Sequence, residues 1–138
     1  MKVVLDANIA IAAMNGVPTV VDRLAAMRGG DVGIPIVAIA ELAYGARRSR
    51  RAAQNLERIA SLRRIIATLP LTEAIVDRYA IVRADLESRG LSKSDFDLLI
   101  ACTAIEERAA LATADGGLLD GTIAGLRAEN WLQASAGR

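Results

Sequence analysis

Short apolar runs alternate along the chain with longer stretches in which apolar residues recur every three or four positions. The short runs predict strands, and the longer periodic stretches predict helices. The expected strands are residues 2–5, 32–37, 67–71, 110–113 and 126–132. The expected helices are residues 19–28, 38–66 with a break near 45–49, 72–90 and 92–109. This alternation predicts an α/β fold in which helices flank both faces of a small, mainly parallel sheet.

Local signals set the ends of several of these elements. Thr19 and Thr72 are good N-cap residues, and we expect each of them to begin a helix. Gly90 is expected to end the second of these helices. Pro35 lacks the N–H group that a strand donates to its neighbour, so we expect the strand there to be interrupted or to lie in an edge-like position.

Length and composition favour one domain that spans residues 1–138, with disorder expected only in its last few residues. Of the 138 residues, 53% are hydrophobic and 24% are charged, and no linker-like or repeated segment divides them. The one cysteine, Cys102, cannot form an internal disulfide, which favours a reducing cytoplasm. The apolar stretch at the N-terminus contains Asp6, so we expect neither a signal peptide nor a membrane anchor there.

The sequence has no histidine, and this absence excludes several kinds of active site. It removes the usual general base, the Ser–His and Cys–His nucleophile pairs, and the commonest zinc ligand. Lysine is also scarce, since only Lys2 and Lys93 occur. By elimination, the acidic residues become the main candidates for hydrolytic chemistry, with or without a metal ion.

Four acidic residues stand near predicted strand ends or helix starts, and each also has a structural explanation. Asp6 follows the first strand and could cap the next helix. Glu41 lies off the apolar face of its helix and could be an ordinary solvated side chain. Asp97 stands three residues after Ser94, which is the spacing of a capping box. Asp115 lies in the sequence Ala-Asp-Gly-Gly, which is good turn chemistry.

Taken together, the four acids are harder to explain as structural residues. The carboxyl ends of parallel strands share one edge of the sheet, and ligand sites gather at that edge. Clustered carboxylates repel one another, and a hard divalent cation such as Mg²⁺ or Mn²⁺ relieves the repulsion. Such ions activate water and stabilise the oxygens of a phosphodiester during cleavage. The pattern therefore predicts a metal-dependent site for phosphodiester hydrolysis.

Four segments resemble, in order, the motifs of PIN-domain ribonucleases, and specifically those of VapC-type toxins. They are LDANI with Asp6 and Asn8, AELAYGA with Glu41, DLLIACTA with Asp97, and LATAD with Thr113 and Asp115. The segment GLRAENWL also resembles the closing strand of that family. Two positions depart from the family pattern: Ala7 stands where Thr or Ser is usual, and two glycines follow Asp115 where an Asp-Phe pair is common.

The resemblance implies a PIN-like three-layer sandwich and Mg²⁺-dependent cleavage of structured RNA, of the tRNA or rRNA class, with Mn²⁺ as an alternative ion. The catalytic and metal-binding residues that it implies are Asp6, Glu41, Asp97 and Asp115, and the supporting residues are Asn8 and Thr113. It also implies a cytoplasmic homodimer that a VapB-type antitoxin inhibits.

A cluster of arginines follows the Glu41 segment. It consists of Arg47, Arg48, Arg50 and Arg51. Closely spaced guanidinium groups suit contacts with RNA phosphates or with an acidic antitoxin surface, although a solvated helix face would have the same composition.

Other functions stay open on the sequence alone. A housekeeping PIN-domain nuclease that processes RNA would carry the same acids. A non-catalytic PIN interaction module would have no need to keep all of them. A phosphatase or phosphoacceptor domain generally needs a lysine after a late strand, and no lysine follows Lys93.

Overall fold

The computed structural model describes residues 1–134, and in that part of the chain it has five strands and seven α-helices. The strands are β1 (Val3–Leu5), β2 (Val32–Pro35), β3 (Ala67–Leu69), β4 (Ala110–Thr113) and β5 (Ala128–Asn130). The helices are α1 (Ala7–Met14), α2 (Pro18–Ala25), α3 (Ile36–Arg48), α4 (Ala52–Ile65), α5 (Glu73–Ser88), α6 (Asp95–Glu106) and α7 (Gly116–Leu119). The disorder expected for the last few residues concerns positions outside this part of the chain.

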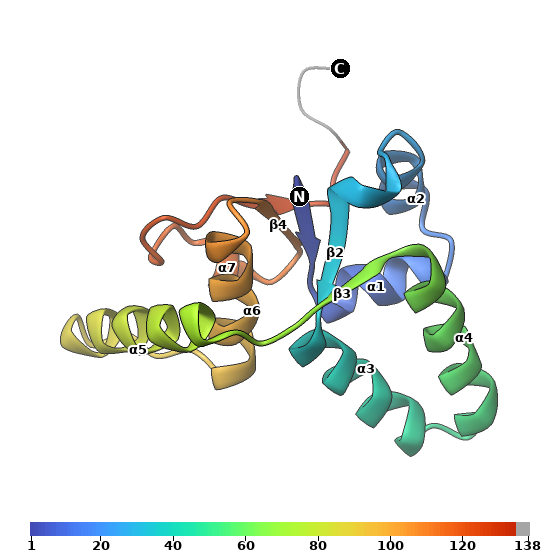
Figure 1. Ribbon diagram of the computed structural model, residues 1–138, viewed down its shortest axis with the longest axis horizontal. Helices are drawn as coiled ribbons and strands as arrows, with labels where there is room; N and C mark the ends of the chain where they lie inside the picture. The colour runs from blue at the N-terminus through green and yellow to red at the C-terminus, as the bar shows by residue number, and fades with distance from the viewer. Residues whose placement is uncertain (135–138) are drawn as a thin grey trace.

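The five strands form one sheet in the order β3-β2-β1-β4-β5, and every neighbouring pair runs parallel. Helices lie on both sides of it: α5, α6 and α7 on one side and α1, α2 and α4 on the other (Figure 1). The α/β fold predicted from the sequence is therefore confirmed. Because all strands point the same way, the residues that follow β1, β2 and β4 emerge at a single edge.

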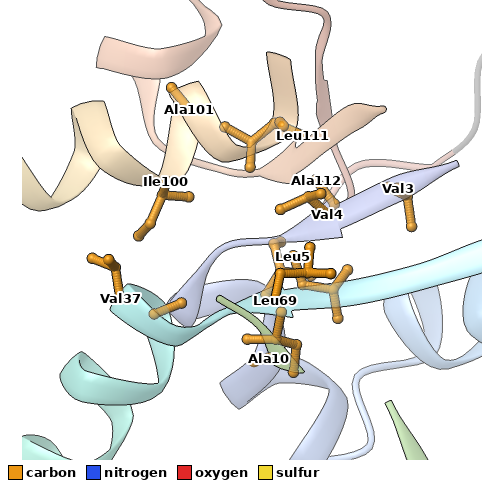
Figure 2. Close-up of a cluster of buried hydrophobic side chains, with 14 of the residues drawn as sticks. Val3, Val4, Leu5, Ala10, Val37, Leu69, Ile100, Ala101, Leu111 and Ala112 are labelled. Atoms are coloured by element: carbon orange, nitrogen blue, oxygen red, sulfur yellow. The ribbon is translucent and has the colours of Figure 1, made fainter. Parts of the chain in front are cut away.

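The centre of the sheet is buried on both faces. Val3, Val4 and Leu5 of β1 are at most 1% exposed, which explains why this strand reads as a continuous apolar run. Figure 2 shows Ile100 of α6 on one side of these strands and Ala10 of α1 on the other. Each fully buried Leu or Ile contributes roughly 1.5–3 kcal/mol to folding. The two elements that carry Asp6 and Asp97 are thus fixed to a rigid core.

Pro35 was expected to interrupt its strand or to place it in an edge-like position, and only the interruption is found. The strand predicted over residues 32–37 stops at Pro35, and α3 begins at the next residue, so the expected interruption is confirmed. The edge-like position is wrong, because β2 lies between β3 and β1. Proline is tolerated inside the sheet here because it is the last residue of the strand, where its missing N–H costs little.

The first two helices differ from the prediction. Helix α1 was not predicted, because its eight residues are apolar almost all round and show no helical period. The expected cap at Thr19 is wrong: Val17 is the N-cap, and Pro18 is the first helical residue of α2. Proline favours that position because its fixed φ suits a helix and the first N–H has no helical partner.

The later elements follow the sequence signals closely. Thr72 caps α5 by accepting a hydrogen bond from the backbone N–H of Ile75 at 3.3 Å, and Gly90 follows the helix with φ +72°, as expected. The long helical stretch divides into α3 and α4 between Arg48 and Ala52. Strand β4 has the predicted bounds, whereas the short helix α7 after it was not foreseen.

None of the helices in the described part combines the length and the apolar character that a bilayer crossing needs.

Candidate active site

Asp6 lies directly after β1, and it caps the helix that follows. One carboxylate oxygen accepts a hydrogen bond from the backbone N–H of Ile9 at 2.9 Å, so the capping role weighed for this residue is real. The other oxygen accepts a hydrogen bond from the hydroxyl of Thr113. The side chain is only 6% exposed. A carboxylate can accept about four hydrogen bonds, so Asp6 retains capacity for a further ligand.

Thr113, the last residue of β4, connects two of the acids. Its buried hydroxyl donates to Asp6 and accepts a hydrogen bond from the backbone N–H of Asp115 at 3.0 Å. Asp115 in turn caps α7, because its Oδ1 accepts from the N–H of Gly117 at 2.9 Å. The supporting position expected for Thr113 thus has a geometric basis. Asn8, the other expected supporting residue, is exposed on α1 and makes no side-chain hydrogen bond within residues 1–134.

Asp97 lies in the first turn of α6. Ser94 is the N-cap of this helix and accepts a hydrogen bond from the Asp97 N–H at 3.2 Å, which confirms the expected capping interaction. The neighbouring acid, Asp95, points elsewhere: it accepts hydrogen bonds from Tyr79 at 2.6 Å and from Arg83 at 3.0 Å. The carboxylate of Asp97 is therefore free of this α5–α6 network and half-buried.

Glu41 lies on α3, in the second turn after β2, and borders two cavities. One of about 290 Å³ lies toward α4, and one of about 590 Å³ lies toward α1 and the start of α6. The side chain is half-buried. Glu41 is therefore more shielded from solvent than the solvated glutamate weighed as its structural explanation.

The pKa values show that the four acids act on one another. Burial raises the pKa of Asp6; the hydrogen bonds from Thr113 and Ile9 oppose this, and the charges of Asp115 and Asp97 add to it. The pKa of Glu41 is also raised, first by burial and then by the charges of Asp97 and Asp6. The four acids, which lie after β1, after β2, after β4 and at the start of α6, therefore share one electrostatic environment.

Asp97 completes this set of interactions. Its pKa is raised mainly by burial, and the hydrogen bond from Ser94 lowers it. The charge of Asp115 and a hydrogen bond with its carboxyl group raise it further, whereas the charge of Lys93 lowers it. An unrelieved cluster of acids of this kind is typical of sites that take up a cation or a proton.

The donor atoms suit a hard divalent cation, although they do not form a closed cage. Within residues 1–134, no three Asp, Glu or Cys side chains lie close enough to hold one ion between them. Mg²⁺ commonly binds through only one or two carboxylates and retains several waters. The residues therefore fit a hydrated Mg²⁺ or Mn²⁺ ion, and the oxygen-only donor set does not favour zinc.

Lys93 is a member of the site that sequence reasoning missed. Its side chain is 10% exposed, and its ammonium group donates hydrogen bonds to the carbonyl of Gly117 and to Asp120 Oδ2, the latter at 2.9 Å. Lys93 thus ties the segment before Asp97 to the turn that carries Asp115. The sequence signal was that one of only two lysines stands four residues before a candidate acid.

The arginine cluster lies at the end of α3 and in the turn before α4. Its four members, Arg47, Arg48, Arg50 and Arg51, are all exposed. None of them forms an ion pair within the described residues. Their charges are therefore available to an external partner.

The profile of the PIN domain matches residues 3–121. The chain belongs to the PIN-domain family. It is 30% identical over 115 residues to Ribonuclease VapC2 of Rickettsia felis, and this alignment covers 82% of this chain and 86% of that protein. It is 29% identical over 131 residues to the tRNA(fMet)-specific endonuclease VapC of Shigella flexneri, and this alignment covers 95% of this chain and 98% of that protein. The resemblance to VapC-type ribonucleases is confirmed.

The fold of this PIN-domain protein agrees with a solved relative. The crystal structure of VapBC2 from Rickettsia felis, bound to a DNA fragment from the promoter, contains a chain that superposes with a TM-score of 0.85 at 29% sequence identity. The match covers 95% of this chain and 99% of that one. The PIN-like three-layer sandwich implied by the sequence motifs is thus confirmed.

Proposed function

We propose that this PIN-domain protein is a Mg²⁺-dependent endoribonuclease that cleaves structured RNA of the tRNA or rRNA class and acts in the cytoplasm as the toxin of a VapBC-type module. One observation carries the proposal. Asp6, Glu41, Asp97 and Asp115, which come from four separate segments, lie within electrostatic reach of one another at one edge of the sheet. Such crowding is costly in a protein unless a cation relieves it.

The acids have different roles in this proposal. Asp6 and Asp97 are the residues that hold the ion, and Asp115, in the turn after β4, contributes negative charge beside them. A bound divalent cation makes water more acidic and stabilises charge on the phosphodiester. Glu41 is half-buried and its pKa is raised, so it is suited to accept a proton from water. Thr113 holds the Asp6 carboxylate in one orientation.

The substrate class rests on the relatives and on the arginine cluster. The Shigella flexneri relative is named for cleavage of tRNA(fMet). Arg47, Arg48, Arg50 and Arg51 add exposed positive charge at and just beyond the C-terminal end of α3, the helix that carries Glu41, where they can contact the phosphates of an RNA chain.

The proposed partner is a VapB-type antitoxin. Support comes from the Rickettsia felis structure, which is a VapBC2 complex. The homodimer implied by the sequence motifs stays a prediction, and light scattering after gel filtration tests it directly.

The test compares two neighbouring aspartates. Purified wild-type protein, Asp97→Asn and Asp95→Asn are incubated with total cellular RNA in Mg²⁺ and in excess EDTA, and new RNA ends are sequenced. Asp97→Asn is expected to abolish cleavage, whereas Asp95→Asn, whose side chain faces Tyr79 and Arg83, is expected to retain it. Full activity in Asp97→Asn or in EDTA would contradict the proposal.

The same experiment separates the alternative functions. A non-catalytic PIN module produces no new ends with any variant. A housekeeping nuclease produces ends at processing sites, and its expression leaves growth intact, whereas a toxin arrests growth until its antitoxin is supplied.

A further inference from the structure

Two exposed aromatic residues of the chain line the same cavity. The chain has only four aromatic residues. Trp131 is buried, and the hydroxyl of Tyr79 is bound to Asp95. The other two, Tyr44 and Phe96, are 63% and 46% exposed. Both line the same cavity, although they come from α3 and α6.

This cavity has the size and composition of a site for a flat organic ring. Its volume is about 590 Å³, within the roughly 300–1,000 Å³ range of small-molecule sites. Ile11 and Leu42 contribute apolar walls, and Asn8 contributes an exposed amide. An amide group can donate to and accept from the edge of a base. Asn8, which has no other side-chain hydrogen bond in the described part of the chain, thereby gains a role.

The cavity adjoins the acidic cluster. Glu41 lines it, and Phe96 directly precedes Asp97 in α6. Tyr44 and Glu41 are three residues apart in α3 and so share a face of the helix. A group in this cavity therefore lies beside the site proposed for phosphodiester cleavage.

The cavity also adjoins the arginine cluster. The guanidinium of Arg48 lies over the Tyr44 ring, 5.5 Å from its centroid, and donates to the Tyr44 hydroxyl at 3.3 Å. The order along α3 is therefore an acid, an exposed aromatic ring and a positive charge. An RNA chain offers the matching order of a reacting phosphate, a base and a further phosphate.

We propose that the cavity binds one unpaired base of the RNA substrate, stacked on Tyr44 and Phe96 beside the cleaved phosphodiester. The proposal rests on the nuclease function proposed above and adds a base-binding cavity lined by Tyr44 and Phe96. Unpaired bases stack on exposed aromatic side chains, whereas the bases of a duplex are not available for this contact.

The test measures whether binding depends on bases. Two fluorescent probes are used: a single-stranded octamer of adenosine and an abasic ribose-phosphate chain of the same length. Affinity is measured by anisotropy in EDTA, so that cleavage cannot occur. Wild-type protein is expected to bind the octamer roughly tenfold or more tightly than the abasic chain, which is the scale of one stacked base.

The variants identify the side chains responsible. Tyr44→Ala and Phe96→Ala are each expected to lose most of this preference, and Tyr44→Phe, which keeps the ring, is expected to retain it. The control is Ile81→Ala, since Ile81 is 62% exposed on α5 and does not line the cavity. Circular dichroism establishes that each variant is folded.

Several results would overturn the proposal. They are equal binding of both probes by the wild type, no measurable binding of the octamer, or a preference that persists in both alanine variants. If Tyr44→Ala and Phe96→Ala instead change the oligomeric state without changing base preference, the cavity is a contact between two copies. Failure of the nuclease proposal is recognised separately, because it appears as an absence of metal-dependent cleavage and not as a change in base preference.

Discussion

Replacement of Asp6 by Asn separates the functional role of this residue from its capping role. Asn keeps the shape of the side chain and caps helices about as well as Asp. Its carbonyl can accept the hydrogen bond from Ile9, and its amide can donate to the hydroxyl of Thr113, which has a second lone pair. The substitution therefore removes one negative charge from the acidic cluster with little change in packing.

The sign of the stability change follows from the pKa values. The pKa of Asp6 is raised in the folded protein, so the folded state binds more protons than the unfolded state and loses stability as the pH rises above the ordinary carboxyl range. Near neutral pH metal-free wild-type protein bears this cost, and the Asn variant lacks it. We expect metal-free Asp6→Asn to melt at or above the wild-type temperature at pH 7, and the difference to diminish as the pH falls toward the ordinary carboxyl pKa of about 4.

Added Mg²⁺ then distinguishes the two proteins. A hundredfold excess over Kd stabilises the binding-competent protein by about 2.7 kcal/mol. For a chain of this length, that corresponds to a rise in Tm of roughly 8 °C. We expect this rise in the wild type and a much smaller one in Asp6→Asn, measured by melting curves in EDTA and in Mg²⁺.

A purely structural Asp6 gives a different pattern. In that case Asp6→Ala costs about 1 kcal/mol through the lost cap, and Mg²⁺ changes neither wild type nor variant, or both equally. Equal stabilisation of wild type and Asp6→Asn by Mg²⁺ would refute the assignment of Asp6 as a metal ligand.

Further predictions concern residues around the acids. Arg47→Ala with Arg48→Ala is expected to weaken RNA binding and to reduce the slope of log affinity against log salt by roughly 2, measured by filter binding. Lys93→Met is expected to shift the acid limb of the activity–pH profile to higher pH, because the charge of Lys93 lowers the pKa of Asp97. Thr113→Val is expected to lower kcat with little change in KM and to cost about 1–3 kcal/mol of stability, because a buried Asp6 oxygen loses its donor.

Matched controls exist for the charged substitutions. Arg63→Ala with Arg64→Ala removes the same charge from the far end of α4, and its effect on RNA binding should be small. Lys2→Met removes the only other lysine, whose side chain is 72% exposed and pairs with Asp31 at 3.8 Å. If the Arg47 and Arg48 substitutions leave the slope of log RNA affinity against log salt unchanged, the arginine cluster does not bind RNA and is an ordinary solvated surface. An acid limb that moves equally for both lysine variants would exclude a local effect of Lys93.

The fold was largely predictable because its signals are local. Val3–Leu5 and Ala110–Thr113 are apolar runs bounded by polar residues, and Thr72 and Ser94 cap their helices as their sequence contexts predict. Helix α1 escaped prediction because seven of its eight residues are apolar, although only Ile9, Ala10 and Ala12 are buried, so its sequence shows no polar face from which a period can be read.

The sequence predicted which acids belong to the candidate site, but it did not predict the hydrogen bonds that hold them. The position of Asp6, Asp97 and Asp115 at element ends follows from the chain, because strand ends and helix starts meet at one sheet edge. The hydrogen bond of Thr113 to Asp6, and those of Lys93 to Gly117 and Asp120, join residues from 24 to 107 positions apart. Such pairings depend on the register of β1 and β4 and on the approach of the segment before α6 to the α7 turn, which no local pattern encodes.

The chemical form of the cleaved RNA ends tests the central claim most directly. Wild-type protein is incubated in Mg²⁺ with an RNA that it cuts, and the ends are analysed by mass spectrometry. Hydrolysis by an activated water leaves only linear phosphate ends, and a 2′-deoxy substitution at the cut nucleotide leaves the rate nearly unchanged. The account predicts both results and a complete loss of product in EDTA. Ends that carry a 2′,3′-cyclic phosphate, formed equally well in EDTA, would show that the ribose hydroxyl is the nucleophile and would contradict a metal-dependent carboxylate site.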